Sequence, residues 1–321
     1  MTSAKTIIRS LGRNRMSVAI SLLIVAAAFL ILYYVLRDVD VGKVMTAFQA
    51  QSRPKIVVAS AFVVAGYVTL TFYDFFALRT IGRDAVPFPV AAFASFTSYT
   101  IGHTLGAATL TGGAVRLRIY SVWGLSVLDV AKIALITGMT FWLGTVFVLG
   151  GAMTYAPEAA AAVDHLPTWI NRLIGLSGLC GILCYLAWLA PRRRAIGYAN
   201  WKIVLPNVRF TLVQIAIGGM DLCLVTLALF NLLPPSPPVD FVSVLIIFLT
   251  ATLLGTISHV PGNLGIMEAA LLIGLPVFEK EGLLAALLTF RILYFVIPVC
   301  LAMLVFGLRE LSLMARPTTT Q

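Results

Sequence analysis

Long apolar runs separated by short polar segments make up most of this chain of 321 residues. A helix needs about 20 apolar residues to cross the hydrocarbon core of a bilayer, and most of the runs reach that length. Because a helix satisfies its own backbone hydrogen bonds in lipid, the pattern predicts membrane-spanning helices. We expect about eight spans, over residues 16–36, 56–78, 90–102, 127–153, 168–190, 210–233, 239–257 and 283–308.

One stretch, residues 258–268, interrupts the apolar region between the last two spans. It contains Pro261, Gly262 and Gly265, followed by the carboxylate of Glu268. Such residues break a helix, and a break at membrane depth is tolerated only where protein or a water-filled cavity receives the freed backbone N–H and C=O groups. A charged residue in that place is a candidate functional group, because charge inside a membrane is costly.

A second stretch has the same layout. Each stretch follows a span that starts after a proline, and each ends in small residues and then a charged residue at matching spacing. The residues concerned are Pro87, Gly112, Gly113 and Arg116 in the first stretch, and Pro238, Gly262, Gly265 and Glu268 in the second. Paired interruptions in two repeated halves indicate a transporter binding site between the halves, with chance recurrence of Gly and Pro as the alternative. We expect the two interruptions to approach each other or to share a cavity.

The predicted fold class is all-α: one polytopic membrane helical bundle over residues 1–321, with repeated halves at about 1–155 and 156–321. Each half is expected to carry a Gly/Pro-broken or re-entrant segment. The composition agrees with this class, since 60% of the residues are hydrophobic and 11% are charged. A soluble domain has about 25% charged residues, so the composition excludes an ordinary soluble protein.

The net charge of +10 suits anionic lipid headgroups, because Lys and Arg gather at the ends of spans and in short loops. We therefore expect membrane lipids, and no nucleic acid, as partners. The basic N-terminus and the arginine cluster at 192–194 are predicted to be cytoplasmic, and the loop at 154–167, which lacks Lys and Arg, to be external. That arrangement needs an odd number of membrane crossings before the loop, whereas the four predicted spans that precede it would give an even number. Residues 88–125 are thus predicted either to cross back or to form a re-entrant hairpin.

Arg291 lies near the middle of the last span, where an arginine costs roughly 3 kcal/mol on insertion scales. It must face the bundle interior, and Glu268 is its expected partner. Arg291 then either connects two helices through an ion pair or binds a lipid phosphate. Its planar guanidinium group suits the second role, because it can donate two parallel hydrogen bonds to a phosphate. Glu268 has three possible roles: capping the helix that starts near Gly265, pairing with Arg291, or recognising a cationic headgroup.

The other candidate residues surround the two interruptions. Arg116 and Arg118 are either interfacial anchors or a capture site for an anionic headgroup, and His103 and His259 are interpreted first as hydrogen-bonded structural residues. The candidate headgroup-binding set is Arg116, Arg118, His259, Asn263, Glu268, Arg291 and Tyr294, and the possible charge partners are Asp74, Lys132 and Asp221.

Sequence motifs of enzymes are sparse. The four cysteines lie in apolar spans and are interpreted as small apolar residues. The sequence contains no HExxH motif, nucleophile elbow or Walker loop, so we expect no metal, no cofactor and no enzymatic activity. The alternative is an intramembrane enzyme that acts on a lipid headgroup through His259, Glu268 and Asp221.

Several motifs, taken with the two-half layout, resemble the lysylphosphatidylglycerol synthase transmembrane family over about residues 10–310. The motifs are Gly112-Gly113-x-x-Arg116 with Tyr120, Gly124-Leu125-Ser126, Pro261-Gly262-x-x-Gly265-x-x-Glu268, and Arg291-x-x-Tyr294 with Pro298. This family is the flippase-like module that is fused to a synthase in multiple-peptide-resistance proteins and stands alone in many bacterial and archaeal inner-membrane proteins. The resemblance implies an inner-membrane lipid translocase for a phospholipid or a lipid with a modified headgroup.

Two departures from the family pattern change what we expect. The 321 residues contain no soluble synthase domain, so we expect no synthesis of lysylphosphatidylglycerol. The position after the first Gly pair is acidic in the family pattern and is Ala114 here, which leaves Glu268 as the principal negative site. A different lipid, such as an isoprenoid or a glycolipid, is therefore also a candidate substrate. A membrane scaffold for a lipid-biosynthetic enzyme partner is the remaining alternative.

Overall fold

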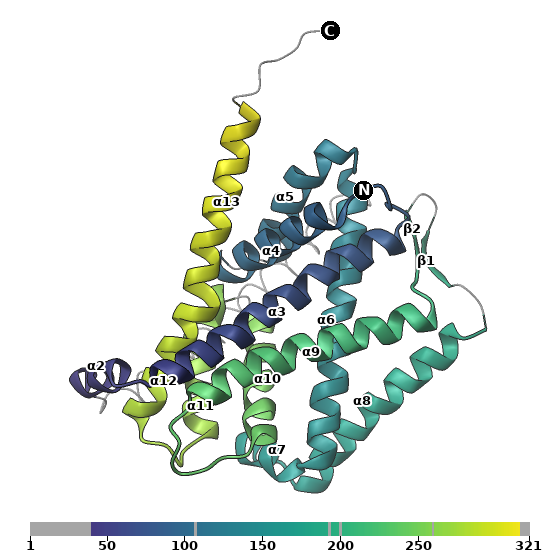
Figure 1. Cartoon of the computed structure of the whole chain (residues 1–321). Coiled ribbons are helices and arrows are strands. Elements are labelled where there is room, and N and C mark those ends of the chain that lie inside the picture. Colours follow the sequence, from purple (N-terminus) through teal and green to yellow (C-terminus); the bar gives the residue numbers. More distant parts are fainter. Residues whose placement is uncertain (1–39, 106–107, 192–193, 199–200, 259, 315–321) are drawn as a thin grey trace, which may run out of the picture.

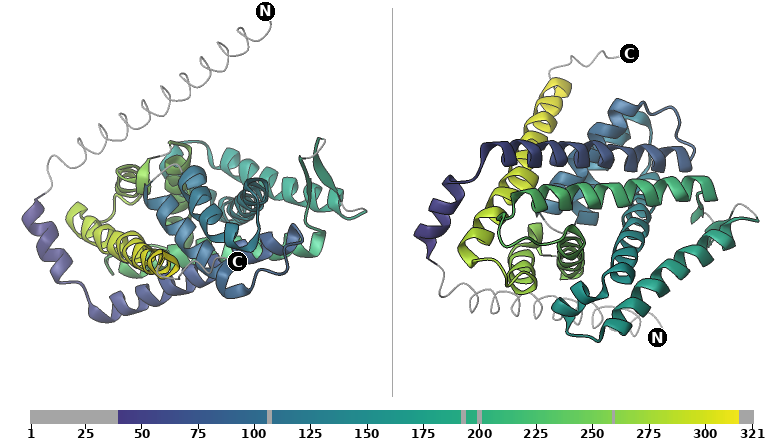
Figure 2. Two further views of the ribbon diagram at one scale, coloured as in Figure 1. Left: turned by 90° about the horizontal axis from the view of Figure 1, so that it is seen from above. Right: turned by 60° about the horizontal axis from the view of Figure 1, so that its bottom comes forward.

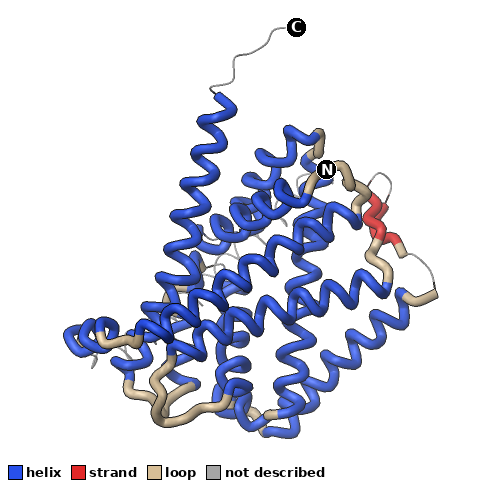
Figure 3. Tube along the Cα trace, in the orientation of Figure 1, coloured by secondary structure: helices blue, strands red, loops and turns tan. Residues whose placement is uncertain are grey.

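The computed structural model describes residues 40–105, 108–191, 194–198, 201–258 and 260–314. Almost all of these residues are helical (Figure 3). The helices are α2 Val41–Gln49, α3 Arg53–Thr80, α4 Phe88–Leu105, α5 Ala108–Tyr120, η1 Ser121–Trp123, α6 Val127–Tyr155, α7 Pro157–Asp164, α8 Thr168–Leu189, α9 Val208–Leu232, α10 Phe241–Ser258, η2 Pro261–Asn263, α11 Ile266–Gly274, α12 Lys280–Arg291, η3 Ile292–Val296 and α13 Ile297–Met314.

A small antiparallel hairpin departs from the all-α prediction. Its strands are β1, Ala195–Tyr198, and β2, Trp201–Val204. The hairpin connects α8 to α9 at one end of the bundle, and α7 lies at the other end of α8 (Figure 1). The fold class is therefore helical with one short two-stranded sheet in a connecting segment.

Six helical segments among the described residues are long and apolar enough to cross a membrane. They are Arg53–Thr80, Val127–Tyr155, Thr168–Leu189, Val208–Leu232, Phe241–Ser258 and Lys280–Ser312. Of the other two predicted spans, 16–36 lies outside the described residues. The remaining one, 90–102, falls in α4, which has many Ser, Thr and Tyr residues and is less apolar than these six.

Close contacts between glycines hold the central helices together. Helices α3 and α9 lie side by side along much of their length, and α6 packs against both α8 and α9 (Figures 1 and 2). A Cβ atom on Gly144 of α6 would lie 2.5 Å from the carbonyl carbon of Gly218 on α9. Membrane helices use small residues in this way, because lipid supplies no hydrophobic force that drives helices together.

Large apolar side chains are exposed on the outside of the bundle. On α8, for example, Leu173, Ile174, Leu176 and Leu183 are each at least 41% exposed. Surfaces of this kind are rare on soluble monomers, whereas lipid solvates them. The exposed apolar faces and the six long apolar helices agree with a membrane location.

The first interruption separates two helices that pack against each other, α4 and α5. Residues 106 and 107, which connect them, lie outside the described residues. The prediction that Gly112 and Gly113 break the helix is wrong, since both lie inside α5. Gly112 instead permits a close helix contact: a Cβ there would lie 2.9 Å from the carbonyl oxygen of Ser98 on α4. A glycine within a helix costs about 1 kcal/mol relative to alanine, and the contact with α4 offsets that cost.

The second interruption lies where the sequence predicts it. The chain turns through left-handed conformations at Gly262 (φ 58°), Asn263 (φ 52°) and Gly265 (φ 79°) before α11 begins. Helix α11 packs back against α10 and has nine residues, which rise about 14 Å at 1.5 Å per residue. Because the hydrocarbon core is about 30 Å thick, α11 by itself does not cross it.

Candidate functional site

The end of α4, next to the first interruption, meets the second interruption inside the bundle. Helix α4 ends against η2, and the carbonyl oxygen of Thr104 lies 4.0 Å from the position that a Cβ on Gly262 would occupy. The prediction is confirmed for the part that the structure describes: the end of α4, which adjoins the first interruption, lies against the second. Glycine is favoured at position 262 because its φ of 58° strains any L side chain.

A cavity of about 60 Å³ lies at this meeting point. Both interruptions contribute to its wall, through His103 and Thr104 on one side and Asn263 on the other. The remaining surface is mixed: four tyrosines, Tyr67 and Tyr73 from α3, Tyr99 from α4 and Tyr294 from η3, lie beside apolar side chains from helices that include α6, α9 and α10. The volume has room for a few water molecules, and hydroxyl, amide and imidazole groups are available to bind them.

Tyr294 faces the cavity in a helix that is locally widened. The π-helical turn η3 contains Tyr294, and Pro298 follows one turn later. Proline has no N–H group, so it cannot donate the helical hydrogen bond to the carbonyl four residues earlier, which is that of Tyr294. The hydroxyl of Tyr67 on α3 donates to this carbonyl oxygen instead, at 2.8 Å. A hydrogen bond between distant segments therefore holds this part of the cavity wall to α3.

Arg291 pairs with Glu268, as predicted. Its guanidinium group donates through Nη2 to Glu268 Oε2 at 2.8 Å and also through Nε to Oε1. It further donates to the carbonyl oxygens of Gly262, at 2.9 Å, and Asn263, at 3.3 Å. Glu268 also accepts a hydrogen bond from the N–H group of Gly265 at 2.9 Å. Pairing and helix capping, which the sequence left as alternatives, are therefore both present, and the broken backbone is satisfied by Arg291.

This pair lies between a groove and the central cavity. The groove, of about 290 Å³, has Glu268 and Arg291 in its wall, and its other lining residues are the apolar Val41, Val44, Leu284, Leu287 and Leu288 of α2 and α12. On its other side, Arg291 contacts Asn263 and the ring of Phe295, which line the central cavity. The two cavities thus approach each other at the Glu268–Arg291 pair.

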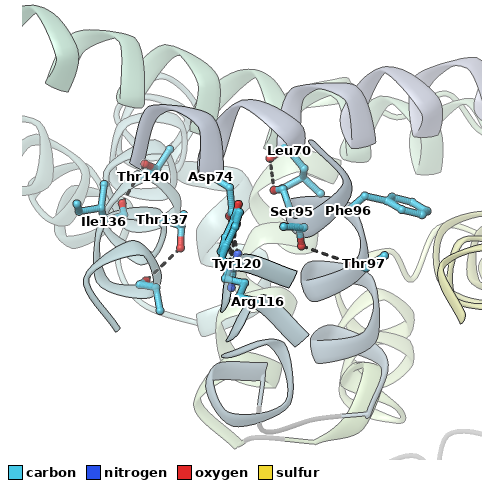
Figure 4. Close-up of polar contacts among 12 residues, drawn as sticks. Leu70, Asp74, Ser95, Phe96, Thr97, Arg116, Tyr120, Ile136, Thr137 and Thr140 are labelled. Carbon is cyan, nitrogen blue, oxygen red and sulfur yellow. Dashed lines mark hydrogen bonds and ion pairs between the residues drawn. The ribbon is translucent and has the colours of Figure 1, made fainter. Parts of the chain in front are cut away.

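Arg116 forms a second ion pair, which is buried. Its guanidinium group donates to Asp74 of α3 with nitrogen–oxygen distances of 2.8 to 3.2 Å, and the Tyr120 hydroxyl donates to the same carboxylate at 2.9 Å. Figure 4 shows Arg116 and Tyr120 converging on Asp74. The side chains of Arg116 and Asp74 are 7% and 0% exposed, and the guanidinium group lies 5.0 Å from the centre of the Tyr99 ring. The guanidinium group of Arg116 is therefore buried and paired inside the protein. Arg116 is neither an interfacial anchor nor an accessible headgroup-binding residue.

The remaining predicted residues are not gathered at one site. Arg118 pairs with Glu310 of α13 at 2.6 Å on an exposed surface. Lys132 is half-buried on α6, and within the described part of the chain no ion pair involves it. His259 lies outside the described residues. Gly113 has open space around its Cα.

Asp221 is predicted as a possible partner for a cation, but no cation of the described residues pairs with it. It lies on α9, is 6% exposed and lines the central cavity. The Tyr73 hydroxyl donates to its Oδ2 atom at 3.3 Å, and Oδ1 is buried without a partner among the described residues. Glu268 faces the groove instead, so these two members of the suggested acid–base set line different cavities. The described residues contain no group of three His, Cys, Asp or Glu side chains that is arranged to hold a metal.

Sequence reasoning named Tyr294 as a candidate and Tyr120 as part of a motif, but it did not identify Tyr67, Tyr73 or Tyr99, nor Tyr120 as a partner of the Asp74 carboxylate. Tyr120 had a readable signal, because it lies four residues after Arg116 and therefore on the same helix face. Tyr67, Tyr73 and Tyr99 belong to helices that meet only through tertiary packing, so their convergence with Tyr294 had no local signal. Glu310, the partner of Arg118, was missed for the same reason.

Together, the long apolar helices, the exposed apolar faces and the polar side chains gathered inside the bundle define an integral membrane protein of the polytopic α-helical class. No family model matches the chain. The chain is 32% identical over 271 residues to the uncharacterized protein slr0712 of Synechocystis, covering 84% of this chain and 83% of the relative. It is 30% identical over 296 residues to the inner membrane protein YbhN of Escherichia coli, with 90% of each chain covered. The chain belongs to the family of these proteins, and its membrane location follows from both the relative and the structure.

Proposed function

We propose that this protein binds a phospholipid, or a lipid with a modified headgroup, and moves it between the two leaflets of the inner membrane. The observation that carries the proposal is the position of the Glu268–Arg291 pair. The pair lies in the wall of an otherwise apolar groove and next to a cavity that contains polar side chains from α4 and η2. An apolar groove beside a polar interior is what a lipid requires, because its acyl chains stay in an apolar medium while its headgroup does not.

Arg291 supplies the chemistry for an anionic headgroup. A guanidinium group binds phosphate through two parallel N–H···O bonds, in the same geometry that it now uses for the carboxylate of Glu268. A lipid phosphate that enters the groove would exchange with Glu268 as the partner of Arg291. Glu268 would keep its hydrogen bond from Gly265 and remain available to a cationic part of the headgroup.

In the topology that we propose, six of the eight predicted spans cross the membrane fully and the N-terminus is cytoplasmic. The other two, residues 90–102 in α4 and 239–257 in α10, are the first arms of re-entrant hairpins. In this arrangement α4–α5 and α10–α11 are corresponding hairpins in two repeated halves. The charge of one arm of each hairpin is paired with a charge on a neighbouring helix: Arg116 with Asp74, and Glu268 with Arg291. The shortness of α11 and the packing of each hairpin on itself support this topology.

The proposal is tested by lipid transport in proteoliposomes that contain the purified full-length protein. Fluorescent phosphatidylglycerol and phosphatidylethanolamine are added to one leaflet, and the accessible fraction is measured by chemical quenching. We expect wild-type protein to exchange at least one of these lipids faster than protein-free vesicles do. Glu268→Gln should lower the rate about tenfold or more, since it removes a charge-assisted hydrogen bond worth about 1.5–3 kcal/mol.

Glu279→Gln is the matched control. Glu279 is an exposed glutamate that precedes α12 and makes no side-chain capping bond. Its replacement should leave transport unchanged. Failure of the wild-type protein to move any labelled lipid would refute the translocase proposal and favour a scaffold role.

A further inference from the structure

Asp221 differs from the other acidic residues inside the bundle. Asp74, Asp129 and Glu268 each accept hydrogen bonds from an arginine, namely Arg116, Arg83 and Arg291. No ion pair involves Asp221 among the residues that the structure describes. It is therefore a buried carboxyl group whose charge, if present, has no partner.

The carboxyl group of Asp221 packs against α3 on one side and lines the central cavity on the other. A Cβ on Gly66 of α3 would lie 3.7 Å from Asp221 Oδ1, so the carboxyl group is packed against that helix. The Tyr73 hydroxyl approaches Oδ2 at 3.3 Å, which is long for a hydrogen bond between oxygens. The carboxyl group also lines the cavity of about 60 Å³, where water has room to reach it.

The titratable groups that face this cavity are few. They are Tyr67 and Tyr73 from α3, Tyr99 and His103 from α4, Asp221 from α9 and Tyr294 from η3. The nearby Arg116 is held by Asp74 and does not line the cavity. A phenol is neutral at physiological pH, so within this described lining the carboxyl group and His103 are the two groups able to gain or lose a proton there.

An ionised carboxylate buried without a counter-charge is unfavourable, because solvation is lost and little replaces it. A proton removes the charge and turns the carboxyl group into a hydrogen-bond donor for cavity water or for a neighbouring hydroxyl oxygen. Loss of that proton recreates the charge, which then requires more water around it. The protonated form therefore suits the present closed cavity, and the ionised form favours a wider, hydrated one.

From the unpaired Oδ1 atom, the cavity that Asp221 lines and the absence of a cation among the described neighbours, we infer that Asp221 is a reversible proton-binding site. Its carboxyl O–H bond breaks when the cavity opens, the proton passes to cavity water, and the carboxylate that remains is hydrated. Rebinding of a proton from water restores the closed form. Proton release is in this way coupled to lipid movement, a role that rests on the proposed lipid translocation.

The test is infrared difference spectroscopy of the purified full-length protein in lipid nanodiscs, titrated between about pH 5 and pH 9, where ordinary carboxyl groups are already ionised. The wild-type protein is expected to show the C=O band of a protonated carboxylic acid that disappears as the pH rises. Asp221→Asn, which preserves the shape of the side chain, should lose that band. Asp240→Asn removes an exposed carboxylate beside Ser243 and should retain the band, as should His103→Gln.

A wild-type protein without a titrating carboxylic acid band would overturn the inference, as would an unchanged band in Asp221→Asn. The measurement on the wild-type protein does not depend on whether the Asp221→Asn variant folds. Transport is then measured in proteoliposomes with and without a pH gradient. The gradient should change the wild-type rate several-fold and leave the Asp221→Asn rate unaffected; equal responses would overturn the coupling. If no lipid moves at all, the proposed function fails, while the spectroscopic result still decides the proton site.

Discussion

The two interrupted hairpins each place a charged residue against an opposite charge, yet the two pairs have different surroundings. Asp74 and Arg116 are almost fully buried, and the Tyr120 hydroxyl occupies a further acceptor site of the carboxylate. Glu268 and Arg291 are each 14% exposed, lie in the wall of a groove and bind the broken backbone of η2. The same kind of ion pair thus connects buried helices in one hairpin and lies in the wall of a groove in the other.

The comparison shows that pairing alone does not identify a functional charge. An intramembrane arginine must find a partner wherever it lies, because an uncompensated charge is costly. What differs is whether the pair has room beside it for a ligand and whether its partners are exchangeable. On these criteria the second pair is the candidate lipid contact, and the first holds α5 to α3.

The largest expected effect comes from removing Asp74. Asp74→Ala leaves Arg116 buried without its counter-charge, and breaking a buried pair in this way costs about 3–5 kcal/mol. Thermal unfolding of the detergent-solubilised protein should show a large loss of stability. Asp84→Ala is the control, because the Asp84–Arg79 pair is 62% and 42% exposed and is worth at most about 1 kcal/mol. Equal effects of the two substitutions would show that the first pair is not a brace.

A smaller effect is expected at the two neighbouring glycines of α5. Gly112→Ala forces a shift, because its Cβ would lie 2.9 Å from the backbone oxygen of Ser98, whereas a Cβ on Gly113 meets no atom within 4 Å. We expect Gly112→Ala to destabilise the hairpin by about 1–3 kcal/mol. Gly113→Ala should stabilise it by about 0.5–1 kcal/mol through helix propensity. Melting temperatures of the two variants measure the difference, and a shift in the same direction for both would contradict the packing of α4 against α5.

Removal of the Tyr67 hydroxyl should have an effect of about 1–2 kcal/mol, because the partly buried hydrogen bond that it donates to the Tyr294 carbonyl oxygen is lost. Tyr67→Phe is measured by thermal unfolding against Tyr185→Phe. The Tyr185 hydroxyl is buried and has no partner among the described residues, so its loss should be neutral or stabilising. Equal destabilisation by both substitutions would show that the Tyr67 hydroxyl does not stabilise the π-helical turn.

The smallest effect is expected at Arg118. Its pair with Glu310 is exposed on the arginine side, and exposed pairs contribute about 0–1 kcal/mol. Arg118→Gln should change the melting temperature slightly, and added salt should abolish the difference because it screens the pair. A large loss of stability or of lipid transport would place Arg118 in the functional machinery and weaken the contrast between the two main pairs.

Residues with a strong local or energetic signal were predictable from the sequence. Pro261, Gly262 and Gly265 break a helix whatever surrounds them, and Arg291 at mid-span requires an acidic partner, which left Glu268 as the expected choice. Gly112 misled the prediction because glycine also permits close helix packing, and only the position of Ser98 on α4 distinguishes the two uses; Gly113 lies in the same helix without such a contact.

Other features depend on tertiary packing that one sequence does not reveal. Asp74 and Asp221 are both aspartates in apolar helices, and the sequence presents both as possible charge partners. Their difference depends on which side chains other helices present: Arg116 and Tyr120 at Asp74, and the cavity at Asp221. The β1–β2 hairpin was missed because its short strands lie within a mixed connecting segment.

The central claim is that the Glu268–Arg291 pair contacts the transported lipid and that the Asp74–Arg116 pair does not. The most direct measurement compares lipid transport by Arg291→Lys and Arg116→Lys, with each rate normalised to the amount of folded protein. Both substitutions keep the positive charge and remove the planar guanidinium group with its parallel N–H donors. We predict a decrease of about tenfold or more for Arg291→Lys and a change within about twofold for Arg116→Lys. Normal transport by Arg291→Lys, or equal losses in both variants, would contradict the claim.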